Sequence, residues 1–331
     1  MNLTRLKIAL ELVLVFVLIG ARAGAFAPDP REAVNDQSPT TEIVTMPTRP
    51  NEPVTDPTES VARIAGHIKD NYARLHTVRA ILQTTSLDRT VTKREEVTIQ
   101  QPNGATVHYV RDPSSVRRER LLLSGEDLYR EGTDENGEIW SFEGGVYSQY
   151  VPSAQTVWLR LPTQMPGISP LDPRNIASLE HRSNFIDKLR GDRVVEVGPA
   201  RTLNGEPRMA ALMEHTFDKG DNERYRCEFD PARNDLPTRI VVFRDGDKIG
   251  IVLDISYEEV IPGTAWFFKK ATQKFFGPDL PRSPDSEAWR QALIVETMGK
   301  VLVNRPIPAD AFLVRLPEGT RVSDAAHSSH D

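Results

Sequence analysis

Five tight-turn dipeptides recur along the chain and constrain its fold more than any other feature. They are Asn-Gly at residues 103–104, 136–137 and 204–205, Gly-Gly at 144–145, and Asp-Gly at 245–246. Such dipeptides supply the positive φ values that two-residue hairpin turns require, and these turns join neighbouring antiparallel strands. The sequence therefore predicts a series of sequential antiparallel strands from about residue 78 onward.

The strands around the last of these turns indicate which face of the sheet is covered. Residues 238–244 and 248–257 flank the Asp-Gly pair, and the second segment alternates between apolar and polar positions. Its apolar positions are Ile249, Ile251, Leu253, Ile255 and Tyr257. Strand residues two apart point to the same face. We therefore expect one face of the sheet to be buried and the other to meet solvent.

A helix is predicted immediately before the first strand. Asp56-Pro57-Thr58-Glu59 combines a capping carboxylate with a proline at the first helical position. Apolar residues then follow at spacings of three and four, which predicts an amphipathic helix over residues 57–77.

Two later segments also have helical patterns. Asp172-Pro173 begins a predicted helix, or two short ones, over residues 172–190, and Ser283-Pro284 begins another that carries Trp289. A strand is expected over 294–303 and a final strand over 312–316. The order of elements predicts an α+β fold, with helices covering the concave face of a large curved antiparallel sheet.

The N-terminal region predicts export. Arg5 and Lys7 precede an apolar core at residues 12–19, and small residues follow, which is the pattern of a signal peptide. We expect cleavage after Ala23 and a periplasmic location. The alternative is an uncleaved N-terminal anchor, although the apolar run is shorter than the roughly 20 residues that a spanning helix needs.

The remaining boundaries follow from composition. Residues 24–55 are predicted to be a disordered linker, because seven prolines fall between Pro28 and Pro57 and no hydrophobic period is present. The folded domain is expected over residues 56–325, and a disordered tail over 326–331.

Charge and motifs exclude several functions. The chain of 331 residues has a net charge of −6, which argues against nucleic-acid binding through bulk charge. A single cysteine, Cys227, permits neither an intrachain disulfide nor a multi-cysteine metal site. No catalytic, phosphate-binding or metal-binding motif is present, so we predict no catalytic residue, no metal and no cofactor.

One basic cluster stands out in the sequence, Arg117-Arg118-Glu119-Arg120. We interpret it as the solvated surface of a strand. The alternative is contact with an acidic partner or with anionic lipid head groups.

Large apolar residues on strands are the main candidates for a binding site. Their simplest interpretation is core packing. If the sheet instead forms an incomplete barrel, its concave face encloses an apolar cavity for acyl chains. The predicted lining residues are Trp140, Phe142, Ile251, Leu253, Ile255, Trp266 and Phe268.

Several segments resemble the LolA/LolB-like outer-membrane lipoprotein-sorting (lipoprotein carrier) family over about residues 58–325. The resemblance is carried by Tyr72-Ala73-Arg74-Leu75, Gly137-Glu138-Ile139-Trp140-Ser141-Phe142, Asp230-Pro231, Leu236-Pro237-Thr238-Arg239-Ile240, Ser256-Tyr257, Ile261-Pro262-Gly263-Thr264 and residues 312–322. It implies an unclosed antiparallel half-barrel, a cavity for lipid or lipoprotein acyl chains, and no enzymatic activity. The linker, residues 160–191 and residues 277–293 are additions to the compact carriers.

Three functions therefore follow from the sequence. The first is an exported, non-enzymatic protein that binds lipid or lipoprotein acyl chains and associates transiently with membranes. The second is an envelope interaction or stress-sensing module with the same fold and other envelope proteins as partners. The third is a hydrolase, which would need a convergent Ser/His/Asp arrangement.

Overall fold

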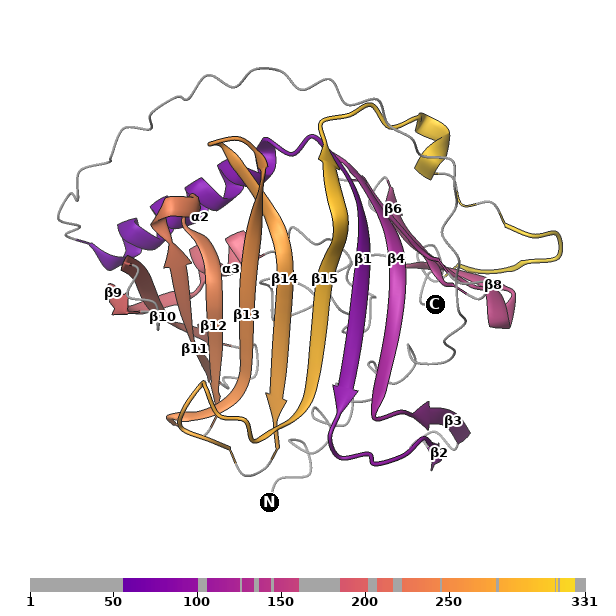
Figure 1. Cartoon of the computed structure of the whole chain (residues 1–331), viewed down its shortest axis with the longest axis horizontal. Coiled ribbons are helices and arrows are strands. Elements are labelled where there is room, and N and C mark those ends of the chain that lie inside the picture. Colours follow the sequence, from indigo (N-terminus) through magenta and orange to yellow (C-terminus); the bar gives the residue numbers. More distant parts are fainter. Residues whose placement is uncertain are drawn as a thin grey trace, which may run out of the picture.

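Figure 1 shows a computed structural model of the chain. It describes residues 56–100, 106–125, 127–133, 137–143, 146–160, 185–201, 207–216, 222–244, 246–277, 280–312, 314 and 316–324. The predicted signal peptide, linker and C-terminal tail lie outside the described residues, as do residues 172–184 of the predicted second helical segment. Within the described ranges, no helix has the length and apolar character that crossing a membrane would require.

The fold is dominated by one open sheet of fourteen strands, with a separate two-stranded sheet formed by β2 and β3. The strands are β1 (Thr77–Asp88), β2 (Glu95–Gln100), β3 (Thr106–Arg111), β4 (Ser114–Ser124), β5 (Asp127–Gly132), β6 (Ile139–Glu143), β7 (Val146–Val151), β8 (Thr156–Arg160), β9 (Arg193–Arg201), β10 (Pro207–Thr216), β11 (Asn222–Asp230), β12 (Leu236–Arg244), β13 (Lys248–Ile261), β14 (Ala265–Phe276), β15 (Trp289–Val303) and β16 (Arg321–Asp324). In the part of the chain that the structure describes, three short 3-10 helices lie between strands: η1 (Pro152–Ala154), η4 (Pro231–Arg233) and η5 (Ala309–Phe312).

The order in the large sheet is β16-β8-β7-β6-β5-β4-β1-β15-β14-β13-β12-β11-β10-β9. Pairing of β1 with β15 joins a half built from β4–β8 to a half built from β9–β15, as Figure 1 shows. Every pair is antiparallel except β8 with β16, and the edge strands β9 and β16 do not pair with each other. The predicted large, unclosed antiparallel sheet is therefore confirmed.

All five turn dipeptides lie between strands that pair with each other. The hairpins are β2/β3, β5/β6, β6/β7, β9/β10 and β12/β13. Gly246, in the last of these turns, has a φ of +80°, which a residue with a side chain adopts only with strain. The predicted sequential antiparallel pairing is therefore present at all five positions.

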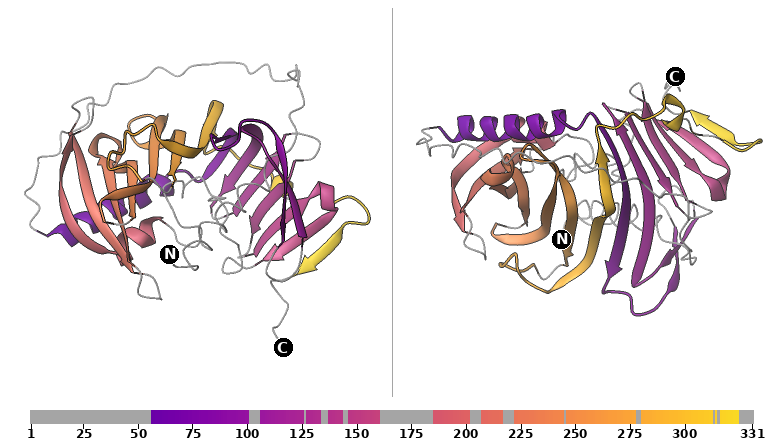
Figure 2. Two further views of the ribbon diagram at one scale, coloured as in Figure 1. Left: turned by 90° about the horizontal axis from the view of Figure 1, so that it is seen from below. Right: turned by 45° about the horizontal axis from the view of Figure 1, so that its top comes forward.

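Helix α2 (Pro57–Ala73) confirms the predicted first helix. The Asp56 carboxylate accepts a hydrogen bond of 2.8 Å from the Thr58 backbone N–H, as a capping residue should. The helix ends four residues earlier than predicted, because Thr77 already begins β1. Figure 2 shows α2 lying across the half of the sheet that contains β9–β14.

A second helix, α3 (Phe185–Gly191), corresponds to the end of the predicted segment 172–190 and finishes at the predicted Gly191. Helix α2 contacts α3, β9, β12 and β14. We call the sheet face that these helices cover the inner face, and the opposite face the outer face. Apolar residues of α2, including Val61, Ile64, Ala65 and Ile68, are buried in the core of the inner face.

A smaller apolar cluster lies on the outer face and corrects one prediction. It contains Val241, Ile249, Val252, Phe276, Trp289 and Ala292. Ile249 was expected to share a face with Ile251, but the pairing of β12 with β13 shifts between these two residues. A β-bulge inserts one extra residue, here Gly250, and so moves Ile249 to the outer face.

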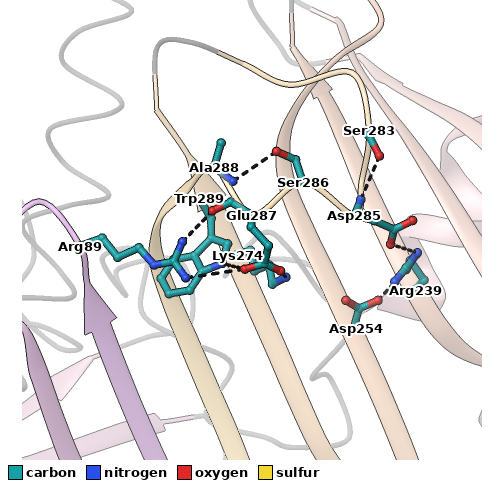
Figure 3. Close-up of polar contacts among 10 residues, drawn as sticks. All are labelled: Arg89, Arg239, Asp254, Lys274, Ser283, Asp285, Ser286, Glu287, Ala288 and Trp289. Carbon is teal, nitrogen blue, oxygen red and sulfur yellow. Dashed lines mark hydrogen bonds and ion pairs between the residues drawn. The ribbon is translucent and has the colours of Figure 1, made fainter.

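The predicted helix from Ser283 is wrong, since the described residues between β14 and β15 contain no helical residue. Figure 3 shows that side chains hold this segment: Glu287 accepts hydrogen bonds of 3.0 Å from Trp289 and from Lys274, and Arg89 stacks 3.4 Å from the centre of the Trp289 ring. The pairing of β14 with β15 shifts between Gln291 and Trp289. Because of this bulge, Trp289 and Ala292 both face the outer cluster although they are three positions apart. A spacing of three is typical of a helix, which explains the wrong prediction.

The predicted final strand over 312–316 is also wrong. Residue 312 ends the 3-10 helix η5, the described residues 314 and 316 have no strand structure, and the last strand is β16. Pro306, Pro308 and Pro317 flank this segment. Proline has no N–H to donate to a neighbouring strand, so prolines on both sides of this segment disfavour its pairing with the sheet.

Candidate functional site

The seven residues predicted to line a cavity all belong to the core of the inner face or pack against it. Trp140 and Phe142 lie on β6, Ile251, Leu253 and Ile255 on β13, and Trp266 and Phe268 on β14. Six of the seven are buried, and Phe142 is half-buried. The two residues of β6 lie in the half built from β4–β8, whereas the other five lie in the half that α2 covers.

Helix α2 is joined to the sheet by polar contacts near its C-terminal end. The buried Asn71 side chain donates a hydrogen bond of 3.0 Å to the Trp266 carbonyl and accepts one of 2.9 Å from the Trp266 N–H. His67 Nδ1 lies 2.6 Å from Asp235 Oδ2, and Arg74 donates to the Thr264 carbonyl at 2.6 Å. The first half of the helix meets the core through apolar residues such as Val61 and Ile64.

A buried polar cluster, which we call the Asp192 cluster, secures α3. Asp192 follows the helix directly, and its carboxylate accepts a hydrogen bond of 2.5 Å from the Tyr225 hydroxyl. His215 Nδ1 lies 2.6 Å from the other carboxylate oxygen, Oδ1. The ammonium of Lys188, a residue of α3, lies 3.5 Å from Oδ2, the oxygen that accepts from Tyr225. These contacts join α3 to β10 and β11.

The hydroxyl and the thiol beside this cluster are held in their neutral forms. Burial raises the pKa of the Tyr225 hydroxyl, and the neighbouring Cys227 and Asp192 raise it further. Burial also raises the pKa of the Cys227 thiol, which has no exposed surface. Because the thiolate is the reactive form, Cys227 is a packed core residue in this structure and not an activated nucleophile.

A second buried polar group lies on the inner face of β4 and β5. The Glu119 side chain is 3% exposed, one of its oxygens lies 2.9 Å from Arg117 Nη2, and the other accepts a hydrogen bond from Arg130. We call these residues the Arg–Glu–Arg triad. The interpretation of residues 117–120 as one solvated basic cluster is therefore wrong, because alternation along β4 sends Arg117 and Glu119 inward.

A cavity of about 280 Å³ lies on the outer face, over β9–β12. Ala210, Leu212 and Phe243 contribute apolar surface, and Arg224 and Arg226 contribute positive charge. None of the seven predicted residues lines this cavity. It is thus separate from the inner face, which remains the candidate site for an apolar ligand.

The described residues contain no group of three His, Cys, Asp or Glu side chains that could hold a metal ion. Two histidines, His67 and His215, each pair with a carboxylate, and both pairs connect a helix or its end to the sheet. The Asp192 cluster had no signal in the sequence, because packing and strand register bring its members together. Of the Arg–Glu–Arg triad, the sequence showed only Arg117 and Glu119, two residues apart in the cluster 117–120.

No protein-family model matches the sequence, and no curated protein matches it either. Among solved structures, the chain is similar to a domain from Vibrio parahaemolyticus that carries the name outer membrane lipoprotein-sorting protein, with a TM-score of 0.50 and 12% identity over 77% of this chain and 97% of that one. A DUF1329 family protein from Desulfovibrio piger has a TM-score of 0.46 and 13% identity over 78% and 98% of the two chains. An uncharacterised conserved protein from Thermus thermophilus has a TM-score of 0.32 and 11% identity over 80% and 99%. The first of these likenesses, together with the open antiparallel sheet and its helical cover, shows that the chain has a LolA/LolB-like fold.

Proposed function

We propose that the chain is a non-enzymatic protein of the cell envelope that binds lipid or lipoprotein acyl chains on its inner face. The observation that carries this proposal is the apolar core of that face, which extends from β10 to β6. In the half built from β9–β15 this core is covered by α2, which contacts α3, β9, β12 and β14, rather than by a second sheet (Figure 2). The name of the Vibrio parahaemolyticus domain, which refers to outer membrane lipoprotein sorting, supports the choice of ligand class.

In this proposal, α2 and α3 act as a removable cover. The first half of α2 buries apolar residues that an acyl chain could replace, while Asn71 and Arg74 keep the C-terminal end of the helix attached. Each methylene that leaves water contributes about 0.8 kcal/mol, so a long acyl chain offsets much of the cost of displacing the helix. The five predicted residues of β13 and β14 would then meet the ligand beneath the helix, and Trp140 and Phe142 of β6 would extend the apolar surface into the other half of the sheet.

The test is a pair of matched substitutions that add equal volume to the two apolar clusters. Ala271 lies in the inner-face core and Ala292 in the outer-face cluster, and both are almost fully buried. We expect Ala271→Leu and Ala292→Leu each to lower the free energy of unfolding by about 1–3 kcal/mol, because both overfill a packed site. Only Ala271→Leu should weaken binding of a fluorescent fatty acid, by about tenfold, which corresponds to about 1.4 kcal/mol.

Two outcomes would contradict the proposal. One is a folded wild-type protein that binds neither fatty acid nor lipopeptide. The other is equal weakening of binding by both substitutions, which would place the ligand elsewhere or attribute the effect to stability alone.

The interaction module is the second candidate, because the protein's own side chains already bury the predicted residues. A wild-type protein that binds no acyl chain but retains a specific envelope partner would favour it.

A further inference from the structure

An exposed apolar patch lies on the outer face, where β15, β1 and β4 run side by side. Ile81 is 38% exposed, Met298 38% and Leu302 42%. Ile81 pairs directly with Met298, and Leu302 pairs with the neighbouring Arg79, so the three apolar side chains form one group. Figure 2 shows β1 and β15 where the two halves of the sheet meet. We call this group the β15 patch.

A bulge in β15 raises the centre of the patch. Three residues of β15, from Gly299 to Val301, stand opposite the single residue Ala80 of β1. Gly299 has a φ of +70°, which marks the point where the strand leaves its regular path. Met298, Gly299 and Lys300 are all exposed. The bulge therefore presents an apolar and a basic side chain beyond the plane of the sheet.

Basic residues surround the apolar group. They are Arg79, Arg118, Arg120, Lys270 and Lys300. Three carboxylates near the patch are each paired with a basic side chain: Glu131 with Arg120, Glu296 with Lys270 at 2.7 Å, and Glu258 with Lys269 at 3.2 Å. Among the described residues, the Arg118 guanidinium contacts only the neutral Gln83 amide, at 3.0 Å. The patch is thus locally positive, although the whole chain has a net charge of −6.

We propose that the β15 patch docks the protein onto an anionic lipid bilayer. Basic side chains attract the negatively charged surface, and exposed apolar side chains enter the boundary between head groups and acyl chains. A fluid bilayer accepts apolar side chains that protrude from a bulge, whereas a protein partner would need a surface of complementary shape. The proposal does not depend on ligand binding to the inner face.

The test is co-sedimentation of the full chain with vesicles of phosphatidylcholine alone or with added phosphatidylglycerol. We expect binding only to the anionic vesicles and a marked loss at high salt, because screening weakens contacts between exposed charges. The N-terminal apolar stretch is the same in every variant, so differences between variants report on the patch.

Two pairs of substitutions separate charge from apolar contact. Arg118→Glu with Lys300→Glu should weaken partition by at least about tenfold, since each basic side chain near an anionic surface contributes to binding. The matched control is Arg224→Glu with Lys248→Glu, two exposed positions on β11 and at the start of β13, strands that do not contribute to the patch. Met298→Ser with Leu302→Ser should also weaken partition, whereas Val195→Ser, at an equally exposed valine of β9, should not.

The proposal is overturned if the wild type fails to bind anionic vesicles, or if patch and control variants lose binding equally. If the wild type does not bind anionic vesicles, an acidic protein is the next partner to test on the patch. Thermal unfolding of each variant verifies that a loss of binding does not come from a loss of fold.

Discussion

Replacing Glu119 with alanine is expected to lower the free energy of unfolding by about 3–5 kcal/mol, because breaking a buried ion pair leaves an uncompensated charge in the interior. Two guanidinium groups, those of Arg117 and Arg130, contact the Glu119 carboxylate and are themselves largely buried. Urea denaturation of the wild type and the Glu119→Ala variant measures the difference.

The matched control removes all three charges together. Arg117→Met, Glu119→Leu and Arg130→Met in one chain should restore most of the lost stability, since apolar replacements of a buried ionic group are often neutral or stabilising. If Glu119→Ala alone lowers the free energy of unfolding by less than about 1 kcal/mol, the triad contributes no more than a solvent-exposed ion pair, and our account of it is wrong.

The same carboxylate predicts a dependence of stability on pH. Burial alone raises the pKa of Glu119, but the facing guanidinium groups of Arg130 and Arg117 outweigh burial and place the pKa below its ordinary value. A carboxylate of this kind stabilises the fold above its unfolded-state pKa of about 4.3, and the contribution disappears as the pH falls through the lower folded-state value. Denaturation of Glu119→Gln should therefore change less over this acid range than that of the wild type.

Asp192→Asn is the second substitution with a large expected effect, a loss of about 3 kcal/mol or more. It removes the charge that faces the buried Lys188 ammonium and His215, and buried charges are costly without a partner of opposite sign. Chemical denaturation gives the change in stability. Because Asp192 connects α3 to β10 and β11, exchange of any bound ligand should also become faster.

A double substitution and a surface control complete this test. Adding Lys188→Met to Asp192→Asn should recover part of the loss, because the unbalanced ammonium is gone. Glu214→Gln, in a pair with the well-exposed Arg193, should cost less than about 1 kcal/mol. An Asp192→Asn protein as stable as the Glu214→Gln protein would show that the cluster does not hold α3.

The elements that the sequence predicted correctly depend on neighbouring residues. The strands on either side of the Asn-Gly and Gly-Gly dipeptides pair as hairpins, as the dipeptides predicted, and Asp56-Pro57 begins α2 through a local cap. Two of the wrong predictions arise at bulges. Gly250 moves Ile249 to the outer face, and the shift beside Trp289 gives a strand the spacing of a helix. A bulge depends on the partner strand, which single-sequence periodicity does not reveal.

The residues of the candidate site also fall into a group that the sequence could predict and a group that it could not. The apolar residues of β13 and β14 were predictable because alternation alone places them on one face. The polar residues were not, since Lys188, His215 and Tyr225 meet Asp192 only after β10 pairs with β11 and α3 packs against them. Likewise, Glu119 finds Arg130 through the register of β4 and β5, eleven residues away in sequence.

Native mass spectrometry of the chain, purified from the envelope of its own cells, tests the central claim most directly. If the inner face binds acyl chains, the wild type and the Ala292→Leu protein should carry an added lipid mass that organic extraction removes, and Ala271→Leu should carry little or none. A wild-type protein without added mass, which also takes up no fatty acid or lipopeptide after purification, would contradict the claim that this fold holds an acyl ligand.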